Sequence, residues 1–208
     1  MATHYRTFGF IIKKTDRGEA DQFLTVYTKD YGKLKILGKA IRKIASKLKS
    51  GAGLFYLSEI EFIQGKRHKT LTDAILVEKF SDIRRDLSKL KMAYQIAETL
   101  DELVPKQEKD RQIWELLNEV FQKLNNPQLP VASCQLLYYY FFWNLVSILG
   151  YQPELRVDSL NGKKIDKDIA KILKLIFKND WPTLSRLKLE LRHPALLKEL
   201  SEWYNKKI

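Results

Sequence analysis

The sequence contains few of the residues that build covalent cross-links and metal sites. It has one cysteine, Cys134, and three histidines, His4, His68 and His193, among 208 residues. A single cysteine excludes a disulfide framework within the chain and a multi-cysteine zinc site, and the scattered histidines lack metal-ligand spacing. We therefore expect a reducing, cytoplasmic setting and neither a metal nor another cofactor.

Motifs of known catalytic sites are missing as well. The glycine-containing stretch at residues 51–53 follows no predicted strand and does not match a phosphate-binding P-loop. Two acidic pairs, Glu59/Glu61 and Asp166/Asp168, have a spacing that allows them to share a strand face and hold Mg²⁺, but paired carboxylates without further ligands are common by chance. We expect a protein that is not an enzyme, with a small metal-dependent nuclease as the enzymatic alternative.

The sequence also lacks a clear membrane-spanning run. Residues 131–149 form a mostly apolar stretch of 19, close to the roughly 20 that a spanning helix needs. Gln135, Asn144 and Ser147 interrupt this stretch, and the first six residues show no long apolar segment like that of a signal peptide. We expect the stretch to form a buried central helix in a protein without a membrane segment.

Positive charge, in contrast, is in excess, with a formal net charge of +12. Residues 1–80 hold 16 lysines and arginines against 8 acidic residues, whereas residues 81–208 hold 21 against 17. A charge of this size indicates a polyanionic partner or an anionic membrane surface. Its concentration in the first 80 residues points to that part of the chain as the place of contact.

The first 80 residues carry the period of β-strands. Alternating or β-branched residues fill five segments, which are residues 7–14, 22–28, 33–37, 57–63 and 71–79. In the third segment, Leu34 and Ile36 are expected to face inward, and Lys33 and Lys35 outward. Residues 40–53 interrupt the pattern and are expected to form a mobile basic connector with a helical turn. Five short antiparallel strands predict a small closed barrel such as an OB-fold.

From Asp82 onward the hydrophobic period is helical. Three apolar stripes cover residues 83–104, 113–124 and 169–177, and Pro182 and Pro194 open two short closing helices. The predicted fold class is therefore α+β. An N-terminal five-stranded OB-fold β-barrel, residues 1–80, binds nucleic acid, and an all-α helical domain, residues 81–208, follows it and serves as core and partner-docking surface.

Two groups of cations mark the predicted barrel. Residues 31–58 contain no acidic residue, which would allow several cations to approach one phosphate backbone together. The predicted hairpin loop between the fourth and fifth strands adds a second group, and this loop flanks the binding face of OB-folds. The candidate DNA-binding residues are Lys33, Lys35, Lys39, Arg42, Lys43, Lys47, Lys49, Lys66, Arg67 and Lys69. A solvated face that serves only solubility is the alternative interpretation.

Aromatic residues in the barrel offer a second kind of contact, because bases of single strands stack on exposed rings. Most of these rings, Phe23 among them, are expected to fill the barrel core. Tyr27, Tyr31 and Tyr56 are the candidates for an outward position.

A further basic stripe follows one side of the third helical segment. It consists of Lys164, Lys167, Lys171, Lys174 and Lys178. A solvated face opposite the core has this pattern, and so does a docking surface for an acidic peptide or for more DNA.

Several motifs together resemble the RecO family of DNA repair and recombination mediators. They are Gly18-Glu19-Ala20-Asp21, the segment at residues 24–34, the segment at residues 38–43 and Leu149-Gly150-Tyr151-Gln152-Pro153-Glu154-Leu155. The order of a basic barrel and a helical domain is similar to that family too.

The resemblance implies an OB-fold that binds single- and double-stranded DNA and anneals complementary strands in a bacterial, nucleoid-associated setting. It also implies action on DNA coated by single-strand-binding protein, whose acidic tail the second lysine stripe would contact, and cooperation with RecR in loading RecA. In one respect the chain departs from the family. Many relatives carry a four-cysteine zinc motif after the Leu-Gly-Tyr-x-Pro segment, but residues 156–164 contain no cysteine.

The residues themselves leave two other functions open. One is an RNA-binding OB-fold protein, because a basic barrel does not reveal which sugar it recognises. The other is a structural adaptor whose charge keeps it soluble.

Overall fold

Five strands form where the period of two predicts them. The computed structural model describes residues 3–187, 189–190 and 192–208. Within them the strands are β1 (His4–Arg17), β2 (Asp21–Thr28), β3 (Gly32–Gly38), β4 (Leu57–Gln64) and β5 (Lys69–Glu78). Every predicted strand segment is thereby confirmed. β1 is longer than its predicted segment because it pairs with β4 through its first half and with β2 along most of its length.

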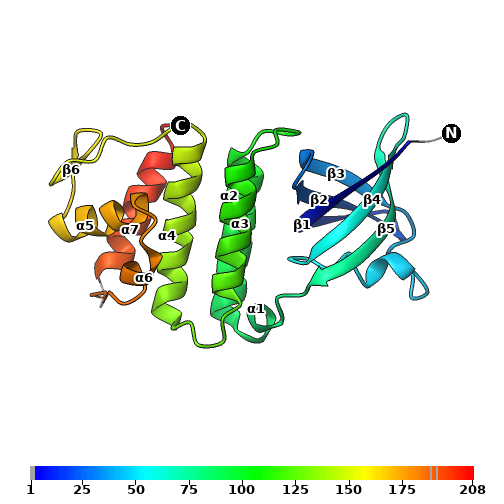
Figure 1. Ribbon diagram of the computed structural model, residues 1–208, viewed down its shortest axis with the longest axis horizontal. Helices are drawn as coiled ribbons and strands as arrows, with labels where there is room; N and C mark the ends of the chain where they lie inside the picture. Colours follow the sequence, from blue (N-terminus) through cyan, green and yellow to red (C-terminus); the bar gives the residue numbers. More distant parts are fainter. Residues whose placement is uncertain (1–2, 188, 191) are drawn as a thin grey trace.

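The strands close into a barrel in the order β1-β2-β3-β5-β4, with β1 completing the circle against β4 (Figure 1). All neighbours are antiparallel except β3 and β5, which run parallel at Ile36↔Lys69 and Leu37↔Thr70. This is the strand order of an OB-fold, so the predicted fold class, a five-stranded OB-fold barrel followed by helices, is confirmed.

The two faces of the barrel wall have different partners. Ile11, Leu24 and Val26 point into the barrel and are fully buried. Phe10 and Tyr27 point outward, yet both are 0% exposed because the helices cover them. The prediction that Tyr27 is an accessible stacking ring is therefore wrong, since a strand residue that faces out of a barrel can still be buried by another layer.

The connector between β3 and β4 is packed against the barrel. It contains a helical turn, η1 (Lys47–Lys49), as predicted. Ile41 and Ala52 are 2% and 0% exposed within the barrel core. Gly51 lies so close to the backbone carbonyl of Ala74 on β5 that a Cβ atom has no room there. The expectation of a mobile connector is wrong, because its few apolar residues anchor it while its lysines face solvent.

The described residues after β5 form helices, one small hairpin and the loops that connect them. The helices are α1 (Ser81–Arg85), α2 (Leu87–Leu103), α3 (Arg111–Leu124), α4 (Val131–Ile148), α5 (Lys167–Phe177), α6 (Trp181–Leu184) and α7 (Arg192–Asn205), and β6 (Ser159–Leu160) pairs with β7 (Lys163–Lys164). The first predicted stripe is split in two at Asp86, whose carboxylate accepts hydrogen bonds from the Ser88 and Lys89 amides and so begins α2. As a result Leu87 is 84% exposed instead of buried.

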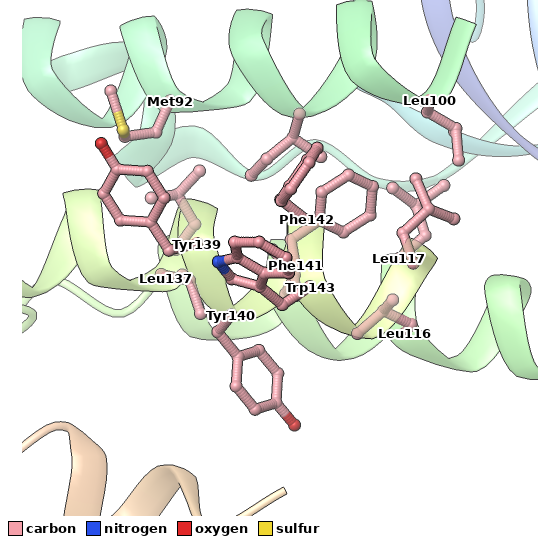
Figure 2. Packing of buried hydrophobic residues seen from close by; sticks show 14 of the residues in the cluster. Met92, Leu100, Leu116, Leu117, Leu137, Tyr139, Tyr140, Phe141, Phe142 and Trp143 are labelled. Carbon is pink, nitrogen blue, oxygen red and sulfur yellow. The ribbon is translucent and has the colours of Figure 1, made fainter. Parts of the chain in front are cut away.

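Helix α4 is the buried centre of the helical part. Figure 2 shows Phe141 and Phe142 of α4 packed beside Leu100 of α2 and Leu117 of α3. The ring of Trp143, also on α4, packs against Phe177 and Tyr204, with 6.3 and 5.1 Å between ring centres. Helices α2 and α3 lie between α4 and the barrel (Figure 1). Within the described part of the chain, no helix is both long and apolar enough to span a bilayer.

Candidate nucleic-acid interface

Most of the predicted basic residues of the connector reach solvent. Lys39, Lys43, Lys47 and Lys49 are exposed, and none forms an ion pair with a carboxylate among the described residues. Their four positive charges remain uncompensated on a connector that packing fixes in place. Such a surface can approach a phosphate backbone without first breaking internal contacts.

Arg42 has a different place from its neighbours in the connector. Its Nη1 lies 3.3 Å from Oδ2 of Asp16 and donates a hydrogen bond of 3.1 Å to the carbonyl of Gly18. The carboxylate of Asp21 accepts a 2.8 Å hydrogen bond from the Ala40 amide. These contacts hold the connector against the β1–β2 loop, so Arg42 is mainly a structural link at the edge of the basic surface.

Positive groups crowd one another beside the connector. Burial lowers the pKa of the Lys14 ammonium group; Asp16 opposes this effect, and the charges of Lys49 and Arg84 lower the pKa further. Like charges held close together repel, and an anion bound among them relieves that repulsion. The local electrostatics therefore favour a polyanionic ligand.

Lys33 does not belong to this surface. Its side chain is buried, its Nζ donates to the backbone carbonyl of Asp101 on α2, and Nζ lies 3.4 Å from Oδ1 of the same residue. Lys13 of β1 reaches Oδ2 of Asp101 at 2.9 Å. The prediction that Lys33 points into solvent and contacts DNA is wrong, because the outward face of β3 at this position is covered by α2.

The loop between β4 and β5 carries the second predicted group. Lys66 and Arg67 are exposed, and Lys69 is half-buried at the start of β5. The parallel pairing Ile36↔Lys69 places this loop beside the end of β3. The loop therefore lies next to the outward face that begins at Lys35.

Phe23 of β2 is the residue of this surface that sequence reasoning missed. Lys35 Nζ lies 4.5 Å and the Arg17 guanidinium carbon 5.1 Å from the centre of its half-buried ring. The His68 ring meets Phe23 edge-on at 5.1 Å from the β4–β5 loop. Since Leu24 and Val26 face inward, the alternation of side chains along β2 places Phe23 on the outside of the barrel. The polar residue Thr25 lies on the same face and was the feature of the sequence that indicated an outward position for Phe23.

The two remaining tyrosine candidates are engaged elsewhere. Tyr31 packs edge-on against Tyr5 and Phe62 at 5.8 and 5.7 Å. The Arg84 guanidinium covers the ring of Tyr56 at 4.8 Å. Both tyrosines are half-buried and pack against the barrel core.

Contacts join these parts into one surface. Arg17 leans over Phe23, and the adjacent Gly18 binds Arg42 of the connector. The β1–β2 loop thus lies between the connector on one side and the face formed by Phe23, Lys35 and the β4–β5 loop on the other. In OB-folds this face of strands 2 and 3, flanked by the β1–β2 and β4–β5 loops, binds oligonucleotides and oligosaccharides.

Comparison with known proteins decides between families that share this fold. Residues 1–80 match the family model described as "Recombination protein O N terminal", and residues 84–174 match "Recombination protein O C terminal". The chain belongs to the RecO family. It is 28% identical over 213 residues to a DNA repair protein RecO from Dehalococcoides mccartyi, an alignment that covers 89% of this chain and 83% of the relative.

Other RecO relatives are matched over a smaller share of their length. A DNA repair protein RecO from a second strain of Dehalococcoides mccartyi is 32% identical over 165 residues, covering 79% of this chain and 64% of the relative. The RecO protein of Acetivibrio thermocellus is 28% identical over 151 residues, covering 72% and 59%. The chain thus spans less than two thirds of several relatives, and its family is one of DNA repair and recombination proteins.

The five lysines of the predicted stripe in the helical part have different surroundings in the structure. Lys164, Lys167, Lys171, Lys174 and Lys178 are all exposed, as a solvated face requires. Only Lys164 lines a neighbouring cleft of about 360 Å³ between the β6–β7 hairpin and α7, with Ile165, Ile169, Leu196 and Leu200 as its apolar wall. Lys171 is paired with Asp168 at 2.9 Å.

The hairpin β6–β7 lies within residues 156–164, the segment without cysteine in which the family resemblance implied a zinc motif. Across residues 3–187, 189–190 and 192–208, no group of three or more histidine, cysteine or acidic side chains is arranged to hold a metal ion. Cys134 is buried in α4, and burial raises the pKa of its thiol.

Proposed function

We propose that this chain is a recombination mediator that binds single- and double-stranded DNA through its barrel and anneals complementary strands. Membership of the RecO family supports a role in DNA repair, and the basic barrel surface supports the binding step. Cooperation with RecR in loading RecA, and action on DNA covered by single-strand-binding protein, are proposed from the family resemblance alone.

The observation that carries the proposal is the set of exposed, unpaired cations on the barrel. The described residues Lys39, Lys43, Lys47 and Lys49 lack a carboxylate partner, and Lys66 and Arg67 extend the surface beyond the β1–β2 loop. Phosphate contacts of this kind position a strand without reading its sequence. Binding is therefore expected on DNA of any sequence and to weaken steeply with salt.

Annealing follows from the same charges. Two DNA strands repel each other through their phosphates, and a polycationic surface that neutralises both lowers this repulsion. Annealing makes or breaks no covalent bond, so the proposed function requires no catalytic residue and no cofactor. The proposed location of the protein is with DNA in the bacterial cytoplasm.

The experiment is an annealing assay with two complementary fluorescently labelled oligonucleotides. We expect the variant Lys39→Ala/Lys43→Ala/Lys47→Ala/Lys49→Ala to anneal them at least about tenfold more slowly than the unchanged protein, because it neutralises fewer phosphates. The matched control is Lys167→Ala/Lys171→Ala/Lys174→Ala/Lys178→Ala, which removes the same charge from the helical part. Equal slowing by both variants would show that net charge alone, and not the barrel surface, drives annealing.

RNA binding is the second candidate function, because phosphate contacts do not distinguish the two sugars. Competition between DNA and RNA oligonucleotides of the same sequence separates the two. A clear preference for RNA would transfer the proposal to RNA handling.

Lys164 of β7 and the lysines that follow it along α5 are proposed as a docking surface for the acidic tail of single-strand-binding protein. The cleft beside Lys164 has apolar walls for the final apolar residue of such a tail; Lys163 and Lys164 supply positive charge at it, while Asp166 and Glu199 also belong to its lining. Lysines at such a rim should raise the association rate more than the affinity. A labelled tail peptide that associates equally fast with the unchanged protein and with Lys164→Glu/Lys167→Glu at low salt would exclude this surface.

A further inference from the structure

We propose that the ring of Phe23 is a stacking site for one unpaired nucleobase, through which the barrel discriminates single strands from duplexes. The inference rests on the proposed nucleic-acid binding and adds a contact that the basic residues do not supply. Phosphate contacts are similar for single strands and duplexes, whereas the flat face of a base is free only when the strand is unpaired and unstacked.

The position of Phe23 suits this role. It lies on β2, with β1 pairing at Thr15↔Phe23 on one side and β3 at Phe23↔Leu37 on the other. Phe23 is half-buried, and Arg17, Lys35 and His68 contact its ring and fix its orientation. A ring held in this way loses little conformational freedom when a base stacks on it.

The cations around Phe23 complete the site. Arg17 comes from β1 and Lys35 from β3, the two strands that flank β2, and both hold positive charge over the ring, 5.1 and 4.5 Å from its centre. Arg17 and Lys35 are themselves exposed, so their cation–π contacts with the ring are weak. When a base takes its place on the ring, the displaced charge lies within reach of the phosphates of the same nucleotide strand. The site thus exchanges a weak cation–π contact for a stacked base and a neutralised phosphate.

Phe8 shows why an exposed ring on the barrel is insufficient by itself. It is 40% exposed on β1, but Glu59 is its partner in the register with β4. Two residues along these strands lies the pair Arg6↔Glu61, in which Arg6 is already bound to the carboxylate of Glu61 at 3.0 Å. A phosphate chain near Phe8 would meet negative charge, whereas near Phe23 it meets Arg17, Lys35 and the basic β4–β5 loop.

The test compares a thymidine oligonucleotide with an abasic oligonucleotide of the same length and charge, and with a duplex. The unchanged protein is expected to bind the thymidine strand about 5- to 150-fold more tightly than the abasic strand, the range that stacking of one base supplies. Phe23→Leu, which keeps an apolar side chain but removes the ring, is expected to bind both with the abasic affinity. Duplex affinity and the salt dependence should not change.

Three variants make the result decisive. Phe23→Tyr keeps the ring and should retain the preference for the thymidine strand, and Phe8→Leu, the matched control, should behave like the unchanged protein. Phe23→Met replaces Phe23→Leu if thermal unfolding shows that the latter does not fold. A Phe23→Leu protein that still prefers the thymidine strand as strongly as the unchanged protein overturns the stacking site while leaving DNA binding intact. Absence of salt-sensitive binding to all three ligands overturns the proposed function as well.

Discussion

Lys33 and Lys35 lie two residues apart on β3, and alternation turns both to the outside of the barrel. The helices cover this outside at Lys33, which is 6% exposed, and leave it open at Lys35. Lys33 thus connects the barrel to the helices, whereas Lys35, on the same strand face, has a charge that a ligand can reach. A strand pattern in the sequence describes the face but not what packs on it.

A pair of substitutions measures this difference. Lys33→Met is expected to lower the free energy of unfolding by about 1–3 kcal/mol, because it leaves the polar atoms of Asp101 without a buried partner. DNA affinity should change little. Lys35→Met should have the opposite profile, with nearly unchanged stability in urea unfolding and weaker DNA binding. If Lys33→Met reduced DNA affinity without affecting stability, the assignment of Lys33 to the contact between barrel and helices would be wrong.

The carboxylate of Asp101, which contacts Lys13 and Lys33 of the barrel, should make the stability of the contact between barrel and helices depend on pH. Burial raises the pKa of this carboxyl, but the hydrogen bond from Lys13 and the charge of Lys33 outweigh it, so the pKa lies below its ordinary value. The folded protein therefore keeps the carboxylate ionised at a pH where the unfolded chain already binds a proton. The resulting stabilisation is complete above about pH 5, roughly one unit above the ordinary pKa of an aspartate, and is lost as the pH falls through the folded pKa.

The corresponding variant is Asp101→Asn. At pH 7 it is expected to be less stable than the unchanged protein, and the difference in unfolding free energy between the two should shrink as the pH falls from about 5 to about 3. Urea unfolding of both proteins at a series of pH values measures this difference. The other carboxyl groups are the same in both proteins, so their contributions cancel in it. A difference that stays constant with pH would contradict the role of the ionised carboxylate.

At the scale of elements, the basic connector depends on the absence of a side chain at Gly51. A Cβ atom there would collide with the backbone carbonyl of Ala74 on β5, which cannot move without disturbing the barrel. We expect Gly51→Ala to cost about 1–3 kcal/mol of stability and to weaken DNA binding, because the connector must shift. Ser46→Ala, in the same connector at a position without a capping hydrogen bond, is the control. Unaltered stability and affinity in Gly51→Ala would show that the connector does not need this packing.

The strands and most helices could be predicted because each carries its own period in the sequence. The packing of the connector could not, since between residues 40 and 53 only Ile41, Leu48 and Ala52 pack against the barrel core, too few for a period to appear. Phe23 was assigned to the core for a related reason. Aromatic residues are usually buried, and the outward position of Phe23 depends on the register that Leu24 and Val26 establish together with barrel closure.

At the scale of the whole molecule, the outer wall of the barrel packs into the apolar core of the helices, while the barrel interior forms a second cluster. Phe10, Ile12 and Tyr27 of the barrel belong to the same cluster as α2, α3 and α4. The division at residues 80/81 predicted from the sequence remains a proposal about chain organisation, while the burial of Phe10, Ile12 and Tyr27 against the helices predicts that the two parts unfold together. Tryptophan fluorescence reports on the helical part, which holds all four tryptophans, and hydrogen exchange of β2 and β3 amides reports on the barrel. The two should give the same unfolding midpoint; a barrel that opens at lower denaturant would indicate independent domains.

The central claim is that the barrel surface binds nucleic acid by neutralising phosphates, and the salt dependence of binding tests it most directly. The logarithm of the association constant for single-stranded DNA is plotted against the logarithm of the salt concentration. We predict that the connector variant Lys39→Ala/Lys43→Ala/Lys47→Ala/Lys49→Ala has a slope flatter by about 0.7 for each phosphate that its alanines no longer neutralise, and that the α5 variant Lys167→Ala/Lys171→Ala/Lys174→Ala/Lys178→Ala keeps the slope of the unchanged protein. A connector variant that folds and yet keeps the original slope would contradict the account.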